Sequence, residues 1–169
     1  TRRRTKMLAE LGYVALAADV YGKGIRPKDA KEAGALAGKY KGDLPLLRSR
    51  VRAAFDTLSK NPRVEASKVL ATGYCFGGTT ALELARSGAP LACVVTFHGG
   101  LGTKDPADAK NIRCPVLALH GAADPYVPPA EVAAFQKEMT DAKVDWQMVL
   151  YADAVHSFTN PGAGNDPSK

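Results

Sequence analysis

The sequence predicts an α/β protein whose mostly parallel sheet lies between two layers of helices. Short apolar runs that suit buried strands alternate along the chain with stretches of helical periodicity. Strands covered on both faces read as continuous apolar runs, whereas strands with one wet face alternate apolar and polar residues. The chain has 169 residues and is 46% hydrophobic, which suits one domain with a sizeable core. We therefore expect a single three-layer α/β/α domain over residues 1–169.

The first third of the chain is expected to hold three helices and one strand. Residues 3–11 have an amphipathic helical pattern, and residues 13–18 are a continuous apolar run that predicts a strand. Residues 27–40 are weakly helical, because two glycines lower their helix propensity. Asp43 suits the N-cap of a strong helix over residues 43–59. The apolar face of that helix consists of Leu47, Val51, Ala54, Phe55 and Leu58.

Strands and helices continue to alternate in the rest of the chain. Apolar runs predict strands over residues 68–72, 91–97, 116–119 and 144–151, and helical patterns lie at 76–87 and 129–140. The second of these helices begins with Pro129, which a first helical turn tolerates well. The chain opens inside a helix and closes in a loop over residues 159–169, so we expect a domain that is incomplete at both ends.

Charge and hydropathy argue against nucleic acid and membranes as partners. The formal net charge is +6, and part of it lies in Arg2, Arg3, Arg4 and Lys6. No aromatic residue is interleaved with these cations to stack on bases, so a solvated helix face explains them better. No stretch approaches the roughly 18 apolar residues that a membrane span needs. The sequence makes no prediction of oligomeric state.

The three cysteines are expected to be free thiols. Cys75, Cys93 and Cys114 are odd in number and irregular in spacing, which argues against a disulfide framework and against a zinc ribbon. Free thiols suit a reducing compartment, and the chain shows no apolar leader. We therefore expect a cytoplasmic protein, with Cys93 and Cys114 as buried bystanders.

The stretch Gly73-Tyr74-Cys75-Phe76-Gly77 is the strongest functional signal. It joins a predicted strand to a predicted helix, and it matches the G-x-S-x-G nucleophile elbow with cysteine in place of serine. Such a sharp turn needs uncrowded backbone on both sides, which glycines supply because they lack Cβ. The pattern predicts strained backbone at Cys75 and an exposed thiol there. A buried structural cysteine is the alternative reading of the five residues taken alone.

An acid and a histidine follow the elbow in the order that a catalytic triad needs. Asp124 lies in the loop after the strand over residues 116–119, and His156 lies just past the strand over residues 144–151. Reactive groups gather at the carboxyl ends of the strands in an open parallel sheet. The order nucleophile, acid, histidine is that of the α/β-hydrolases. His156 could take the proton of Cys75, while Asp124 holds the imidazole in its tautomer.

The helix after the elbow is expected to stabilise negative charge. Its N-terminal dipole favours the thiolate of Cys75, and the backbone N–H of Phe76 is the expected first oxyanion donor. Three further residues are candidates for the wall of a substrate pocket, namely Tyr74, His98 and Tyr126.

Other polar residues near strand ends have simpler interpretations. His120 precedes a tight turn and is expected to be structural, and Asp19 is expected to stabilise its own loop. Asp153 precedes His156 by three residues and competes with Asp124 for the orienting role. Trp146 is most simply a core residue.

The chain resembles the dienelactone hydrolase family of α/β-hydrolases from about Leu8 to Phe158. The resemblance rests on the elbow over residues 73–78, the His-Gly-x-x-Asp-x-x-Val-Pro loop around Asp124, the late His-Ser-Phe, and the Leu-Gly-Tyr-Val-Ala-Leu-Ala-Ala-Asp-Val-Tyr-Gly stretch near the start. It implies a Cys75–His156–Asp124 triad that hydrolyses small esters or lactones through an acyl-cysteine intermediate. It also implies that neither a metal nor an organic cofactor takes part.

The chain departs from the family pattern in two respects. The first strands, which carry the second oxyanion donor and a glutamate that helps activate the thiol, have no counterpart here, and the closing helix is also missing. The family's dienelactone-cleaving enzymes carry an arginine four residues after the histidine, where this chain has Asn160. This departure argues against dienelactone itself as substrate and leaves the hydrolase class intact.

Two alternative functions remain open at this point. Class I glutamine amidotransferases also place cysteine on a G-x-C-x-G elbow, but they pair it with a His-x-Glu, and here Ser157 and Phe158 follow His156. A hydrolase-like fold that serves as a non-catalytic binding module is the other alternative.

Overall fold

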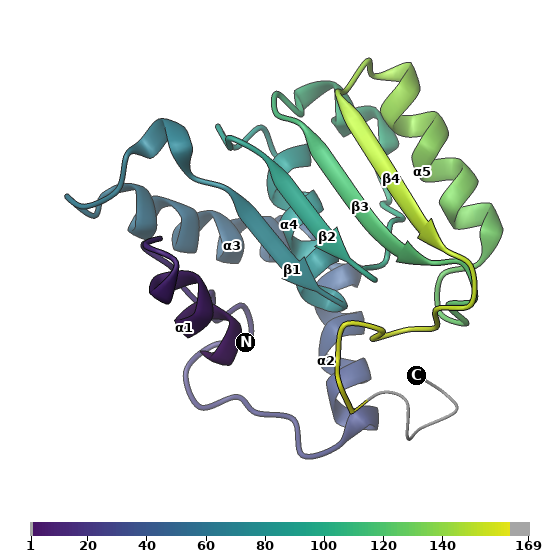
Figure 1. The fold of residues 1–169 in the computed structure, drawn as a ribbon, viewed down its shortest axis with the longest axis horizontal. Coiled ribbons are helices and arrows are strands. Elements are labelled where there is room, and N and C mark those ends of the chain that lie inside the picture. Colours follow the sequence, from purple (N-terminus) through teal and green to yellow (C-terminus); the bar gives the residue numbers. More distant parts are fainter. Residues whose placement is uncertain (1, 163–169) are drawn as a thin grey trace. The chain divides into compact units, whose positions relative to one another are not determined.

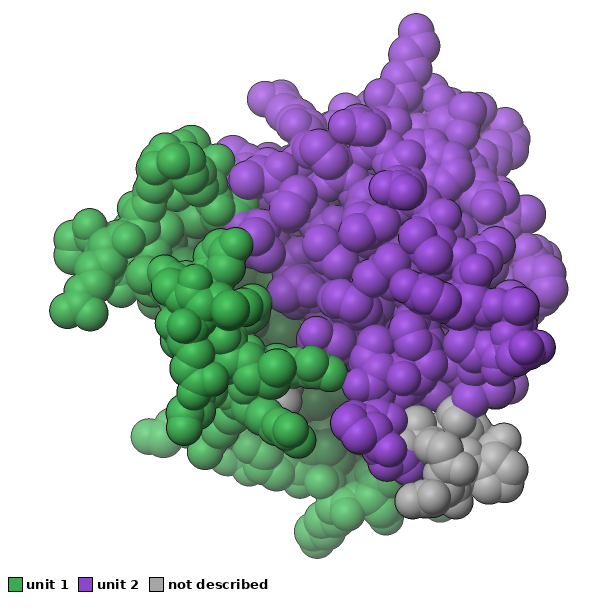
Figure 2. All heavy atoms as spheres, viewed as in Figure 1, with its two compact units in different colours: residues 1–69 green, residues 70–169 purple. Residues whose placement is uncertain are grey.

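A computed structural model describes residues 2–162 of the chain. The chain divides into two compact units, Thr1–Val69 and Leu70–Lys169, which Figure 2 distinguishes by colour. Each unit is described by itself below, and the single-domain organisation stays a prediction.

Unit 1 is helical in its described residues. It contains α1 (Arg2–Glu10), α2 (Ala30–Gly42), α3 (Leu44–Ser59) and the short 3₁₀ helix η1 (Ala66–Lys68). The predicted cap of α3 is confirmed, because the carboxylate of Asp43 accepts the N–H of Leu46 at 3.0 Å. The apolar stripe of α3 is buried at Leu47, Val51 and Phe55, as its periodicity predicts.

The predicted strand over residues 13–18 is wrong. This segment forms no ladder with any described strand, and Tyr13, Val14 and Leu16 are exposed. A strand exists only where a neighbour takes its backbone hydrogen bonds, and apolar composition alone does not provide one.

Unit 2 contains a four-stranded parallel sheet, shown in Figure 1. The strands are β1 (Ala71–Tyr74), β2 (Val94–Phe97), β3 (Val116–Gly121) and β4 (Trp146–Tyr151), and they lie in the order β1-β2-β3-β4. Helix α4 (Phe76–Arg86), the 3₁₀ helix η2 (Pro106–Asn111) and helix α5 (Pro129–Asp141) connect them. The predicted α/β class and parallel pairing are confirmed. Strand β1 begins three residues later than predicted, so it runs directly into the elbow.

Helices α4 and α5 pack on the same face of this sheet. Thr96 of β2 faces Gly78 of α4, and the ring of Trp146 in β4 packs edge-on against Phe135 of α5 at 6.2 Å. In β2 and β3, side chains on this face are buried, such as Val94 and Ala118, while Val95 and Leu117 on the opposite face are half-buried. Within the described part of unit 2, α4 and α5 therefore form one helical layer on the sheet.

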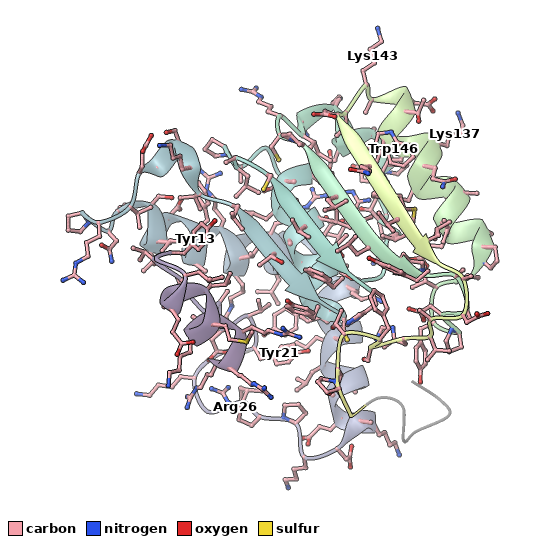
Figure 3. The ribbon with its side chains drawn as sticks, viewed as in Figure 1. Tyr13, Tyr21, Arg26, Lys137, Lys143 and Trp146 are labelled. Carbon is pink, nitrogen blue, oxygen red and sulfur yellow. The ribbon has the colours of Figure 1, made fainter. Side chains whose placement is uncertain are left out.

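A buried cation joins the two helices on the covered face. The side chain of Arg86 is fully buried and donates two hydrogen bonds to Glu138 of α5, at 2.8 and 2.7 Å. It also donates to Glu83 at 2.9 Å and to the carbonyl of Leu101 at 2.9 Å. A bidentate pair of this kind fixes both distance and orientation. By contrast, Lys137 points outward from α5 into solvent (Figure 3).

None of the described helices is both long enough and apolar enough to cross a lipid bilayer.

Removal of the buried cation should destabilise unit 2 strongly. Arg86→Met retains most of the volume but leaves the carboxylates of Glu83 and Glu138 buried without a positive partner. We expect the free energy of unfolding to fall by about 3–5 kcal/mol in a urea titration. Lys137→Met breaks the exposed pair with Asp141 and should cost at most about 0.5 kcal/mol. Similar losses in the two variants would contradict the structural role of Arg86.

Candidate active site

The candidate site lies at the carboxyl end of the sheet in unit 2. Cys75 follows β1 directly, Asp124 lies three residues after β3, and His156 lies five residues after β4. Parallel strands all end at this edge, so residues that are far apart in sequence meet there. The structure thus brings together the nucleophile, acid and histidine candidates that the sequence placed in this order.

The backbone at Cys75 is strained, as predicted for an elbow. Its φ and ψ are 51° and −124°, a combination that residues with a side chain rarely adopt. The close approach of α4 to β1 forces this turn, because a Cβ atom on Gly73 would overlap the backbone of Gly77. We expected Gly77 to be needed for the same reason, and this is wrong, since a Cβ atom there would meet open space. The second crowded glycine is Gly78, where a Cβ would overlap the hydroxyl of Thr96.

A hydrogen bond links the acid to the histidine. Nδ1 of His156 lies 2.9 Å from Oδ2 of Asp124, whose side chain is fully buried. The other carboxylate oxygen accepts the N–H of Tyr126 at 2.9 Å, which holds the acid in place. The alternative partner, Asp153, is exposed, and among the described residues the carboxylate bonded to His156 is that of Asp124. The imidazole is therefore oriented by Asp124, and its second nitrogen is left for the thiol.

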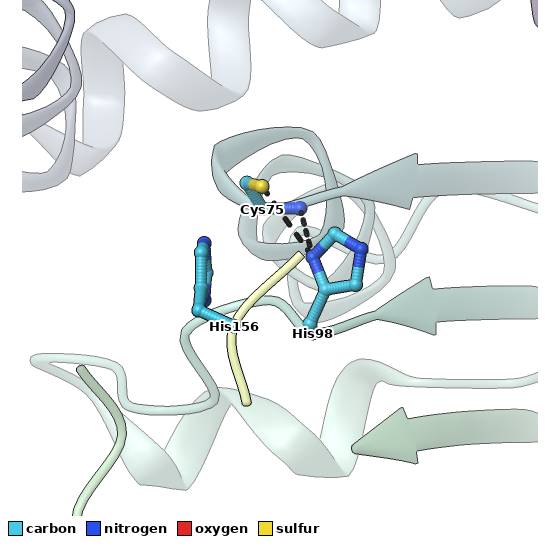
Figure 4. A group of neighbouring side chains, drawn as sticks. All are labelled: Cys75, His98 and His156. Carbon is cyan, nitrogen blue, oxygen red and sulfur yellow. Dashed lines mark hydrogen bonds between the residues drawn. The ribbon is translucent and has the colours of Figure 1, made fainter. Parts of the chain in front are cut away.

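Two histidines and a serine surround the thiol. Figure 4 shows His156 and His98 beside Cys75. Nδ1 of His98 lies 3.4 Å from the Cys75 sulfur and also accepts the Cys75 N–H at 3.3 Å. The hydroxyl of Ser157 lies 3.5 Å from the same sulfur. These contacts make the thiol the centre of a compact polar cluster.

The sequence analysis assigned His98 only to a pocket wall, and the parallel register explains its closer role. Tyr74 pairs with Phe97, so the next residue of each strand, Cys75 and His98, lie side by side at the sheet edge. The second predicted strand ends correctly at residue 97, and this pairing could have been read from the sequence had the first strand been extended to residue 74. Ser157 carried no signal of its own beyond its place in the His-Ser-Phe stretch.

Aromatic side chains contact the two histidines of the cluster, and their role as a pocket wall stays a prediction. The exposed ring of Tyr126 stands edge-on to His156 at 5.0 Å. Tyr74 stacks on Phe97 at 4.7 Å and lies 6.0 Å from His98. Such rings offer apolar surface to a substrate while leaving the polar groups accessible.

Electrostatics favour an ion pair between Cys75 and His156. Burial opposes ionisation of the thiol, but hydrogen bonds from His156, His98 and Ser157 outweigh it and lower the pKa of Cys75 to about 6. The hydrogen bond with Cys75 raises the pKa of His156 to about 9 against the effect of burial, and Asp124 adds to the rise. Between these values the thiolate and the imidazolium coexist, as a coupled pair.

The remaining candidates lie outside this cluster of contacts. His120 is buried, burial lowers its pKa, and neither ring nitrogen has a hydrogen-bond partner among the described residues. Asp19 accepts the N–H of Gly22 at 3.1 Å and so stabilises its own loop in unit 1. Cys114 is buried as expected, but Cys93 is half-buried. All three cysteines are free thiols.

Comparisons with known proteins agree with this geometry. A family model described as the dienelactone hydrolase family matches residues 1–168. A Salmonella typhimurium protein described as a candidate carboxymethylenebutenolidase is 28% identical, over 90% of this chain and 60% of its own length. A Bradyrhizobium protein described as a candidate 2-oxo-3-(5-oxofuran-2-ylidene)propanoate lactonase is 29% identical, over 89% of this chain and 64% of its own. The chain thus spans less than two thirds of these relatives.

A solved structure is similar over nearly the whole chain. It is the crystal structure of a dienelactone hydrolase-like promiscuous phosphotriesterase from metagenomic libraries. It is 47% identical with a TM-score of 0.90, and the match covers 97% of this chain and 68% of that one.

The thiol should ionise well below its ordinary pKa of about 8.5. We expect the rate at which iodoacetamide alkylates Cys75, in chelator-treated protein, to rise through about pH 6, because the neighbouring imidazoles favour the thiolate. His156→Gln should move this midpoint upward. Peptide mass spectrometry identifies the alkylated residue.

Cys114 provides the internal control for this measurement. Burial raises the pKa of its thiol, and Cys93 nearby adds to the rise. Its alkylation should therefore begin only at higher pH than an ordinary thiol requires. A midpoint for Cys75 at or above about 8.5 would contradict the ion pair.

Proposed function

The chain belongs to the dienelactone hydrolase family, and from that membership we propose that the protein hydrolyses small carboxylic esters or lactones with Cys75 as nucleophile. The observation that carries the proposal is the hydrogen bond between Asp124 and His156, together with a ring nitrogen of His156 within 4.8 Å of the Cys75 sulfur at a strained elbow. This reaction needs Cys75 as a free thiol, which suits a cytoplasmic location.

The first half of the reaction transfers the acyl group to sulfur. The thiolate of Cys75 attacks the carbonyl carbon, and the carbonyl electron pair moves to oxygen. That oxyanion forms beside the N-terminus of α4, where the N–H of Phe76 is the proposed donor. When the intermediate collapses, the C–O bond breaks and the imidazolium of His156 gives its proton to the leaving alkoxide.

The second half returns the enzyme to its starting state. His156, now neutral, takes a proton from water while the water oxygen attacks the acyl-cysteine carbonyl. The C–S bond then breaks, which releases a carboxylic acid and restores the thiolate and the imidazolium. Throughout, Asp124 holds Nδ1 of His156 and stabilises its positive charge.

The relative described as a promiscuous phosphotriesterase favours a second substrate class. At 47% identity over nearly the whole chain, the same thiolate is proposed to attack the phosphorus of aryl phosphotriesters. The glutamine amidotransferase alternative loses support, because the acid that orients His156 comes from a separate loop. The binding-module alternative predicts no hydrolysis at all.

A test compares the full-length protein with two cysteine variants on 4-nitrophenyl acetate. Cys75→Ala should lower kcat by about 10⁴-fold or more, because the nucleophile is lost. The wild type should release a burst of 4-nitrophenol equal to the enzyme concentration, and mass spectrometry should find one acyl group on Cys75.

The control for this test is Cys93→Ala, which removes a half-buried thiol outside the cluster. It should retain wild-type rates. Diethyl 4-nitrophenyl phosphate in the same assay tests the second substrate class. Equal rates in wild type and Cys75→Ala on both substrates would refute the nucleophile and favour a binding module.

A further inference from the structure

We propose that Cys75, His98 and His156 form a binding site for Zn²⁺ and that the bound ion blocks hydrolysis. One ligand atom of each residue, a sulfur or a ring nitrogen, lies within 4.8 Å of the other two. The three residues follow three different strands, β1, β2 and β4, so the sheet edge itself holds them together. One thiolate and two imidazoles are ligands that zinc prefers.

The spacing between the thiol and the first imidazole suits a tetrahedral ion. Zinc binds sulfur at about 2.3 Å and imidazole nitrogen at about 2.0–2.1 Å, so the two atoms lie about 3.5 Å apart at a tetrahedral angle. The Cys75 sulfur and Nδ1 of His98 are 3.4 Å apart. This pair therefore needs almost no rearrangement, and His156, whose ligand atom lies within 4.8 Å of both, must move closer to the ion to complete a three-residue site.

Each imidazole is anchored through its remote nitrogen. Nε2 of His98 lies 2.8 Å from the hydroxyl of Thr159, and Nδ1 of His156 lies 2.9 Å from the carboxylate of Asp124. In zinc proteins such outer hydrogen bonds fix the ring orientation and strengthen the ligand. For His98 the anchor is on the nitrogen away from the Cys75 sulfur, and for His156 the anchor leaves Nε2 to the ion.

The contacts of Nδ1 of His98 allow the form of the ring that binds metal. The Cys75 N–H points at this nitrogen and so supports the tautomer with the proton on Nε2 and a lone pair on Nδ1. Metal binding would select that tautomer over the one that donates to the Cys75 sulfur. The Cys75 N–H also donates to the carbonyl of Phe97 at 3.1 Å. A metal ion can therefore take the lone pair of His98 without leaving the amide unsatisfied.

Zinc at this site would occupy the groups that the proposed reaction uses. The thiolate would bind the ion instead of attacking a carbonyl, and His156 could neither take nor give a proton. Any thiol proton would leave to the buffer on binding, and no electron would be transferred. The His156 side chain is 18% exposed, and a water molecule would complete the tetrahedron at the fourth position.

Cobalt titration of the chelator-treated full-length protein tests the site without substrate. Co²⁺ bound to a thiolate in tetrahedral geometry absorbs in the near ultraviolet and the visible, and Zn²⁺ should displace it. We expect one Co²⁺ per chain in the wild type, and no thiolate band in Cys75→Ala. Mg²⁺, which prefers oxygen ligands, should not compete.

Two variants test the imidazoles and their anchors. His98→Asn places an amide oxygen near the position of Nδ1, so it can still accept the Cys75 N–H but is a poor zinc ligand. It should weaken Zn²⁺ binding by at least about tenfold, and Thr159→Val, which removes only the anchor, by about 10- to 100-fold. Cys93→Ala is the matched control and should bind as the wild type does.

The results separate this proposal from the hydrolase proposal. A wild type without a thiolate–cobalt band overturns the metal site, whether or not it hydrolyses esters. If His98→Asn binds Zn²⁺ as tightly as the wild type, His98 is not a ligand. If that variant does not fold, wild-type Zn²⁺ affinity in Thr159→Val would lead to the same conclusion. A wild type that binds Co²⁺ as expected but hydrolyses nothing in its chelator-treated, metal-free form supports the metal site and refutes the hydrolase.

Discussion

Helix α4 approaches strand β1 so closely at the elbow that Gly73 has no room for a Cβ atom. The chain must therefore reverse within one residue, and Cys75 takes a positive φ to do so. This conformation is costly, by roughly 1–3 kcal/mol, and persists only because the surrounding packing determines it. It is also what brings the sulfur to the N-terminus of α4 and into reach of His98 and His156. The chemistry of the site thus follows from a steric constraint between one helix and one strand.

The two ends of α4 have different physical roles. At its N-terminus lies the strained and partly accessible thiol, surrounded by groups that can change protonation. Near its C-terminus, Arg86 is fully buried and bonds to α5 and to the loop that carries Leu101. A buried ion pair is costly to form but very costly to break, so it suits a place where nothing should move. The ion pair of Arg86 near the C-terminus of α4 therefore fixes the helix, and the fixed helix keeps Cys75 at its N-terminus in the strained conformation.

Much of this arrangement could be predicted from the sequence, and the failures have common physical causes. Helix α3 and the order of Cys75, Asp124 and His156 follow from local signals, namely a capping aspartate, an apolar stripe and loop motifs. The strand over residues 13–18 was wrong because apolar composition does not provide a pairing partner. The contact of His98 with the thiol was missed because it depends on the register between β1 and β2, and the end of β1 was placed two residues too early.

The features that activate the thiol are also the features that would make it sensitive to zinc. A thiolate is stabilised by nearby imidazoles whose orientation is fixed from behind, by Asp124 for His156 and by Thr159 for His98. The same fixed lone pairs and the same sulfur form a nearly complete tetrahedral ligand set. A hydrolase with a serine nucleophile would lack the soft sulfur ligand, and a hydrolase without His98 would lack the third protein ligand of the zinc ion. Cysteine in the elbow and histidine after the neighbouring strand therefore couple reactivity to metal sensitivity. A substitution that removed either imidazole to prevent zinc binding would also remove a group that lowers the pKa of Cys75.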